Sequence, residues 1–201
     1  MLKLVFLILL FQIKVYAQDK IIAEILNTTV KDGDTLKIRV SNQTNQAIFL
    51  PWEVSVLSYK MLMEDFFRTS VFIPKISLKD IDTNELVPFS GEGTSMSGGF
   101  VSFDEWTTLL DNRKVEDFIL LKSGEEKEIT IPFKLCWSTD ADNFYMYSIS
   151  QNNYNLILTY HLDQELMKKF INTEVLQQLK KKGYVPFFEK IESNQIPLII
   201  D

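Results

Sequence analysis

The single histidine and the single cysteine are the residues of this chain that could form a nucleophile and its base. His161 is the only imidazole and Cys136 the only thiol. A thiol hydrolase needs these two side chains within hydrogen-bond reach of one another. His161 falls on the polar face of a predicted strand, whereas Cys136 lies in an apolar run, and nothing in the spacing brings them together. We therefore expect a solvated histidine, a buried cysteine and no catalytic dyad.

Two further motifs fall short of a complete site. Residues 93–97 read Gly-Thr-Ser-Met-Ser and lack the final glycine of a nucleophile elbow. Three Asp-x-Asp pairs are present: Asp32/Asp34, Asp80/Asp82 and Asp140/Asp142. Carboxylate oxygens suit calcium, but no bidentate acid follows at the spacing of a calcium loop. We expect these aspartates in turns and caps, with no metal site, no cofactor and no catalytic residue. The abundance of acids leaves an acid-pair hydrolase open.

Aromatic side chains are the remaining groups that could contact a ligand. Trp106 follows the glycine- and serine-rich residues 90–99, which we expect to form a flexible loop, and Tyr145 and Tyr147 lie in the segment 138–153. Exposed rings stack on sugars or anchor a protein partner, although most aromatic residues of a sheet protein are buried. Trp106, Tyr145 and Tyr147 are the candidate binding residues.

The first 17 residues have the layout of a secretory signal peptide. Lys3 precedes an unbroken apolar run, residues 4–11, and Val15 and Ala17 suit a cleavage site. The run is about half of the ~20 residues that cross a bilayer. We therefore expect cleavage near Ala17, a secreted or periplasmic location and no stable membrane insertion afterwards. Retention of the segment as an anchor is the alternative.

The mature chain, residues 18–201, has the composition of one globular domain. With 46% hydrophobic and 24% charged residues it can bury a substantial core. One cysteine excludes an internal disulfide, and one histidine excludes motifs that hold a metal with two histidines. Removal of residues 1–17 takes away two lysines and no acid, which shifts the formal net charge from −6 to −8. Nucleic acid is therefore a poor partner, because phosphate binding needs a basic face.

Alternation of apolar and polar residues predicts strands over most of the mature chain. Residues 35–40 alternate cleanly, and Asp32-Gly33-Asp34 before them predicts a hairpin with residues 21–30. The other predicted strands are residues 47–50, 154–162 and 195–200, a hairpin of 118–121 with 128–133, and a hairpin of 72–79 with 85–89 around the turn at 82–84.

Residues 163–182 break this pattern and predict helix. Met167, Ile171, Val175 and Leu179 recur every four residues. Asp163 suits the start and Gly183 the stop, and Asn172 with Thr173 can divide the segment into two short helices. We expect its apolar stripe to pack on the sheet.

Two stretches resemble immunoglobulin-like modules of exported bacterial proteins. Residues 36–40, Leu-Lys-Ile-Arg-Val, lead to Asn42 and the apolar strand 47–50, as strands B and C of those modules do. Residues 118–125, followed by alternating apolar residues, resemble the hairpin with the turn Gly-Glu. The resemblance implies a mainly β fold, an immunoglobulin-like antiparallel β-sandwich with a helical insertion near the C-terminus, and it implies no catalytic residues.

Two functional hypotheses follow. The first is a non-enzymatic interaction or accessory module of the cell envelope, which binds an envelope protein through the loop 90–112 and the segment 138–153. The second is a secreted carbohydrate-binding or carbohydrate-active protein, which binds a glycan through exposed aromatic and acidic residues.

Overall fold

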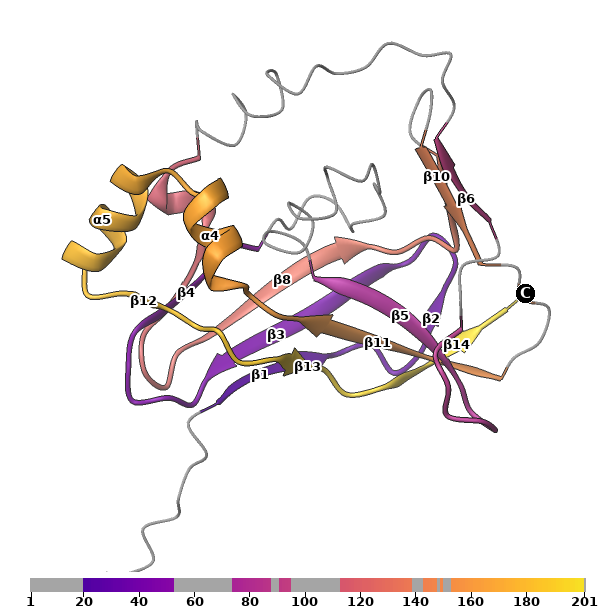
Figure 1. The fold of residues 1–201 in the computed structure, drawn as a ribbon. Helices are drawn as coiled ribbons and strands as arrows, with labels where there is room; N and C mark the ends of the chain where they lie inside the picture. Colours follow the sequence, from indigo (N-terminus) through magenta and orange to yellow (C-terminus); the bar gives the residue numbers. More distant parts are fainter. Residues whose placement is uncertain are drawn as a thin grey trace, which may run out of the picture.

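The computed structural model describes residues 20–52, 74–87, 91–94, 113–138, 143–147, 149 and 153–200, with the backbone alone for 91–94, 136–138 and 143–146. The predicted signal peptide lies outside the described residues. These residues form a mainly β structure with two short helices near the C-terminus, and the helices lie at one end of its long axis (Figure 1). In the described part of the chain, no helix combines the length and apolarity that a bilayer crossing requires.

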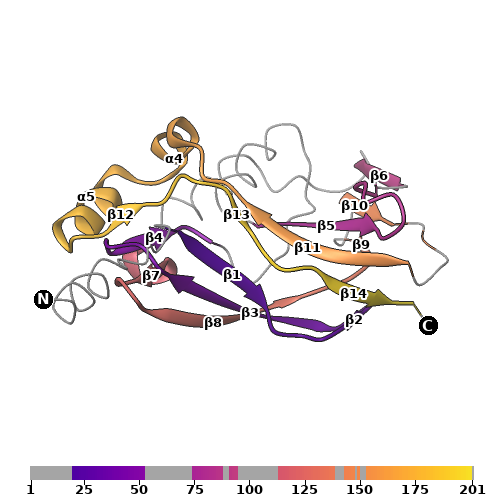
Figure 2. The ribbon, with the colours of Figure 1, turned by 90° about the horizontal axis from the view of Figure 1, so that it is seen from below.

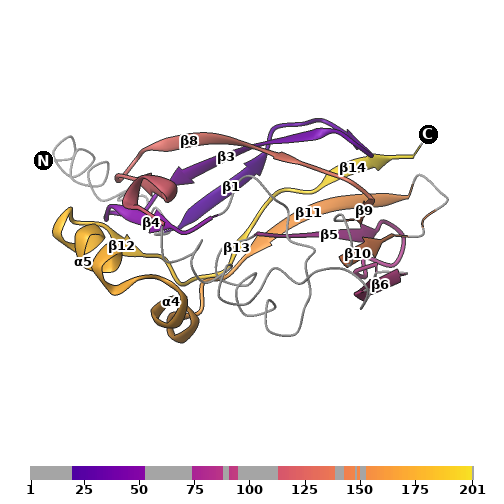
Figure 3. The ribbon, with the colours of Figure 1, turned by 90° about the horizontal axis from the view of Figure 1, so that it is seen from above.

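The first sheet confirms the clearest strand prediction. Strand β3 (Thr35–Asn42) pairs antiparallel with β1 (Ile21–Ile25) on one side and with β8 (Glu126–Pro132) on the other. Leu36, Ile38 and Val40 are fully buried, because alternate side chains of a strand point to the same face. Gly33 has a φ of +84°, which glycine adopts without steric cost in the turn before β3. Figure 3 shows β8 as the outer strand of this sheet.

The second sheet has β11 (Tyr154–Tyr160) at its centre, as the alternation in residues 154–162 predicts. Antiparallel partners lie on both sides of it: β5 (Lys75–Asp80), β13 (Ile191–Glu192) and β14 (Ile196–Ile199). β2 (Val30–Lys31) pairs parallel with β14. The predicted strand 21–30 is therefore divided between two sheets, and the second sheet is mixed rather than purely antiparallel.

A main-chain bridge and the side chain of Asn194 join the first sheet to the second. Ala23 of β1 forms a parallel bridge with Ser193, and the Asn194 amide bonds the backbone of Ile25 twice. The Ile25 N–H donates to Asn194 Oδ1 at 2.7 Å, and Asn194 Nδ2 donates to the Ile25 carbonyl at 3.1 Å. Asn194 thus replaces a backbone peptide at the seam, and the two sheets run side by side along the molecule (Figure 2).

The third sheet contradicts the predicted hairpin of residues 118–121 with 128–133. β7 (Ile119–Leu121) pairs antiparallel with β4 (Ile48–Leu50), whereas β8 pairs with β3. β12 (Val185–Pro186) pairs parallel with β4, so this sheet is also mixed. The turn at 122–125 therefore exists, with Gly124 at a φ of +75°, but it carries the chain from one sheet into another.

A buried asparagine explains why β7 and β8 do not pair across the turn at 122–125. Asn42 is 1% exposed, and its Nδ2 donates to the carbonyls of Gln46, Leu121 and Lys122 at 2.8–3.0 Å. Its Oδ1 accepts from the N–H and the hydroxyl of Thr44. The side chain thus ties the end of β3 to two neighbouring turns, and buried polar groups of this kind are stable only when bonded.

The helical segment divides as Asn172 and Thr173 indicate. α4 (Gln164–Phe170) begins at Asp163, whose carboxylate accepts from the Leu166 N–H, and α5 (Thr173–Lys181) begins at Asn172, whose Oδ1 accepts from the Glu174 N–H. Gly183 has a φ of +83° just after α5. The apolar stripe faces the core, where Leu179 is fully buried. A short 3-10 helix, η1 (Val115–Asp117), contacts α5.

A small sheet lies at the opposite end of the molecule from the helices (Figure 1). β10 (Asn143–Met146) pairs antiparallel with β6 (Gly91–Thr94) and with β9 (Cys136–Ser138). Residues 91–94 are thus a strand, although residues 90–99 were expected to form a flexible loop. The sequence Gly-Glu-Gly-Thr has little strand propensity of its own, and main-chain pairing with β10 imposes the extended backbone.

Candidate interaction site

The three candidate binding residues lie in different situations. Trp106 lies outside the described residues, and Tyr145 is in β10, where the backbone alone is described. Tyr147 is 6% exposed and belongs to the hydrophobic core. Burial raises the pKa of Tyr147 to about 12, and a hydrogen bond from the Leu78 backbone opposes this rise. The Tyr147 ring therefore offers no open face to a ligand and supports strand β5 from within.

The two predicted binding segments are nevertheless brought together. β6 belongs to the loop 90–112 and β10 to the segment 138–153, and they pair over four positions from Asn143↔Thr94 to Met146↔Gly91. Asn153, at the end of the second segment, contacts the turn that follows β5. Described parts of both segments and the β5 turn thus share the end of the molecule that lies away from the helices (Figure 1).

The β5 turn, residues 80–86, is held by its own polar side chains. Asp80 Oδ1 accepts from the N–H groups of Asp82 and Thr83, both at 2.9 Å, and from the Thr83 hydroxyl at 3.3 Å. The Asn84 N–H donates to the Asp80 carbonyl at 2.9 Å, and Asn84 has a φ of +59°. Asparagine tolerates this left-handed conformation better than most residues. The sequence prediction of a turn around residues 82–84 is confirmed.

Asn153 fixes the β5 turn to the strand beside it. The Ile81 N–H donates to the Asn153 carbonyl at 3.0 Å, and Asn153 Nδ2 donates to Asp82 Oδ2. At the base of the turn, the Asp80 N–H donates to the Glu85 carbonyl and the Val87 N–H to the Leu78 carbonyl. Bonds at the tip, the flank and the base restrict the turn to one conformation.

This restricted turn presents two large apolar side chains to solvent. Ile81 is 49% exposed and Leu86 58% exposed, and they are two of the three large exposed hydrophobic residues in the described ranges. Residues 80–86 include three acids, Asp80, Asp82 and Glu85, and no lysine or arginine. Exposed apolar side chains on a turn that is already held by hydrogen bonds suit a contact site, because little conformational entropy is lost on binding.

The described aspartates of the Asp-x-Asp pairs have structural roles. His161 is exposed. Asp34 accepts from the Lys31 N–H and Asp32 from the Leu135 N–H, so both carboxylates, like Asp80, bond the backbone of turns. Within the described ranges no group of three or more histidine, cysteine, aspartate or glutamate residues could hold a metal ion. Asp140 and Asp142 lie outside those ranges.

Sequence reasoning missed the apolar pair of the β5 turn. Leu86 falls in the predicted strand 85–89, in which an apolar residue is expected to be buried, and Ile81 lies between the predicted strand 72–79 and the turn at 82–84. The signal that could have found them is the placement of two large aliphatic residues beside Asp82, Thr83 and Asn84, which mark the tip of an exposed turn.

Comparison with known proteins gives no relationship. No family model matches the chain, and neither a curated protein nor a solved structure matches it.

Proposed function

We propose that this chain is an exported, non-enzymatic interaction module of the cell envelope, and that the β5 turn is part of its contact surface. One observation carries the proposal: Ile81 and Leu86 stand exposed on a turn whose hydrogen bonds hold it in one conformation. Exposed aliphatic side chains contribute nothing to a core, whereas their burial against a partner is favourable.

The described carboxylates support an interaction role over hydrolysis. Asp32, Asp34 and Asp80 accept hydrogen bonds from backbone N–H groups in turns, and Asp163 caps α4. These four carboxylates are thus occupied in holding turns and a helix start, which is a structural role rather than a catalytic one.

The proposed location depends on the signal peptide in residues 1–17. Expression of the full chain in the source cell should release a protein whose mass corresponds to residues 18–201. A mass that includes residues 1–17, recovered in the membrane fraction, would instead establish a retained anchor.

We propose, for the fold, a relationship to immunoglobulin-like sandwiches. In such sandwiches consecutive strands often switch between sheets. Two switches support the proposal: the chain passes from β3 to β4 and from β7 to β8 between different sheets, and the residues of both sheets belong to one core. An experimental structure that separates these sheets into different cores would contradict it.

Site-specific photo-cross-linking tests the interaction role. A photoreactive residue in place of Ile81 should give a discrete adduct in an envelope extract, and excess unlabelled mature protein should compete it away. Unlabelled Ile81→Ser/Leu86→Ser protein should compete poorly. The same photoreactive residue at Lys37, exposed on the first sheet, serves as the matched control. Equal adducts at 81 and 37, or equal competition by both proteins, would overturn the proposal.

Binding of a glycan can be distinguished from binding of a protein. Soluble envelope glycan that quenches tryptophan fluorescence, with no protein adduct at position 81, would replace the interaction module by the carbohydrate-binding hypothesis.

A further inference from the structure

The large exposed apolar residues of the described ranges lie in two places of opposite charge. Ile81 and Leu86 belong to the acidic β5 turn, and Val185, 37% exposed, belongs to β12. β12 follows the end of α5, where the lysines of the last turn suit the negative end of the helix dipole. Residues 80–86 therefore carry only acidic side chains around their apolar pair, whereas the charged residues of the segment that contains Val185, residues 180–188, are all lysines.

The second place, here called the basic patch, consists of residues 180–188. Its charged residues are Lys180, Lys181 and Lys182, and no acid lies among its nine positions. Tyr184, Phe187 and Phe188 pack against the core while remaining partly exposed around Val185. Among the described strands, β12 pairs with β4 alone and so ends its sheet. The basic patch thus offers apolar surface, cations and a strand with one side unpaired in the described part of the chain.

The cations of the basic patch are little neutralised by described residues. Lys182 Nζ lies 4.0 Å from Glu116 Oε1, at the limit of an ion pair. No described carboxylate forms an ion pair with Lys180 or Lys181, both of which are exposed. On the β5 turn, Glu85 is likewise exposed and forms no ion pair within the described ranges. Each surface therefore carries charge that a surface of opposite sign can neutralise.

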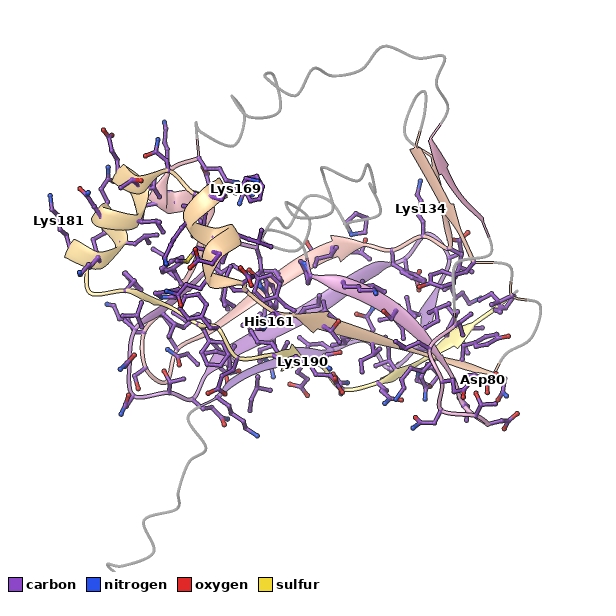
Figure 4. The ribbon with its side chains drawn as sticks, in the orientation of Figure 1. Asp80, Lys134, His161, Lys169, Lys181 and Lys190 are labelled. Carbon is purple, nitrogen blue, oxygen red and sulfur yellow. The ribbon has the colours of Figure 1, made fainter. Side chains whose placement is uncertain are left out.

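The positions of the two surfaces exclude a contact within one molecule. Asp80 and Lys181, which mark the β5 turn and the basic patch, lie at opposite ends of the molecule (Figure 4). We propose that the β5 turn of one copy docks on the basic patch of a second copy. This proposal rests on the proposed role of the β5 turn as a contact surface and names its partner as another molecule of this chain.

Such a contact is heterologous, because two different surfaces of the chain meet. After pairing, the copy that contributed its turn keeps a free patch and the other copy keeps a free turn. The contact can therefore continue head to tail into open chains rather than stop at a symmetric dimer. Burial of Ile81 and Leu86 against Val185 and the aromatic rings gives the attraction, and opposite charges set the orientation. Because the charges are exposed, added salt screens them and weakens the association.

Sedimentation velocity of the mature protein, residues 18–201, tests the proposal. At low salt, the average sedimentation coefficient should rise with concentration beyond the value of a dimer, and added salt should lower it. The turn variant Ile81→Ser/Leu86→Ser and the patch variant Lys181→Glu/Val185→Ser should each remain monomeric. Lys37→Glu, a charge reversal outside both surfaces, should associate as the unaltered protein does. Circular dichroism and thermal melting of each variant confirm that it is folded.

Mixing the two variants gives the decisive outcome. The turn variant retains an intact patch and the patch variant an intact turn, so the equimolar mixture should form a one-to-one dimer and nothing larger. A mixture that stays monomeric, an unaltered protein that is monomeric at every concentration, or a symmetric dimer that is insensitive to both variants would overturn self-association. A discrete photo-cross-linked adduct between position 81 and a different protein would then still support the interaction module. The absence of any adduct would remove both proposals.

Discussion

Two turns of this molecule use the same side-chain chemistry for different ends. Asn42 Oδ1 accepts from the N–H and the hydroxyl of Thr44, and Asp80 Oδ1 accepts from the N–H and the hydroxyl of Thr83. Asn42 is buried and joins three segments of the chain, whereas the turn of Asp80 projects from the body and is bonded mainly to itself and to Asn153. The turn of Asn42 therefore connects the first sheet to the third, and the turn of Asp80 fixes the position of two exposed apolar side chains.

Burial distinguishes polar residues that stabilise the fold from polar residues that hold the contact surface. A buried polar group with several partners is costly to remove, because each partner is left unsatisfied in the core. Removal of a hydrogen bond in an exposed turn lowers the free energy of unfolding only slightly, since water replaces the lost partner. Substitution of Asn42 should thus lower the free energy of unfolding, whereas substitution of Ile81 and Leu86 should weaken association with a partner.

Substitution of Asn42 should lower the free energy of unfolding more than any other change considered below. Asn42→Ala leaves the carbonyls of Gln46, Leu121 and Lys122 without their side-chain donor, and we expect a loss of about 3 kcal/mol or more in the free energy of unfolding. Urea denaturation measures it. Asn27→Ala is the matched control, because Asn27 bonds the backbone of Thr35 and Lys37 at the surface. Equal losses for the two variants would contradict the distinction between the turns.

Ionisation of Tyr147 at alkaline pH should cause the next largest loss in the free energy of unfolding. Its pKa is raised to about 12 by burial, so the native state favours the neutral phenol. The corresponding stability is fully present below the unfolded pKa of about 10 and is lost as the pH rises through about 12, a change of about 2–3 kcal/mol. Tyr147→Phe should reduce this alkaline loss in unfolding experiments. Burial also raises the pKa of Tyr160, so part of the loss should persist. An unchanged alkaline loss in Tyr147→Phe would show that the phenol is not the source.

Replacement of Asp80 should have a smaller effect on stability. Asp80→Ala removes the acceptor of the Asp82 and Thr83 N–H groups, and we expect a loss of about 1 kcal/mol in urea denaturation. Asp80→Asn keeps an acceptor oxygen and should recover most of this loss. If Asp80→Asn were as unstable as Asp80→Ala, the charge rather than the hydrogen bonds would hold the turn.

Calcium should have no effect on the melting temperature. The carboxylates of Asp32, Asp34 and Asp80 already accept from backbone N–H groups, which a cation would have to displace. Thermal melting with millimolar calcium measures this. A clear rise that is lost in Asp140→Ala/Asp142→Ala would contradict the turn assignment of the Asp-x-Asp pairs.

The sequence predicts local structure far better than strand partners. Alternation in residues 35–40 and 154–162, Gly33 in its turn, the cap at Asp163 and the division of the helix at Asn172 and Thr173 all depend on neighbours along the chain, and the structure confirms them. The hairpin predicted at 118–133 is wrong because the Asn42 amide, far away in sequence, bonds the carbonyls of Leu121 and Lys122. The parallel pairing of β2 with β14 is equally non-local.

The candidate site shows the same limit. A turn at 82–84 was predictable from Asp82, Thr83 and Asn84, but the exposure of Leu86 was not, because an isolated aliphatic residue after a turn is equally typical of a buried strand. Tyr147 was plausible as a ligand contact from sequence alone, and its burial depends on packing beside β5.

On the proposed function, a partner covers the β5 turn in its native setting. Hydroxyl-radical footprinting of Ile81 and Leu86, in the dilute purified protein and in the intact envelope, tests this directly, with exposed His161 as the reference. We expect both residues to be labelled in the purified protein and protected relative to His161 in the envelope. Equal labelling in the two states would show that the turn is uncovered and would contradict its role as a contact surface.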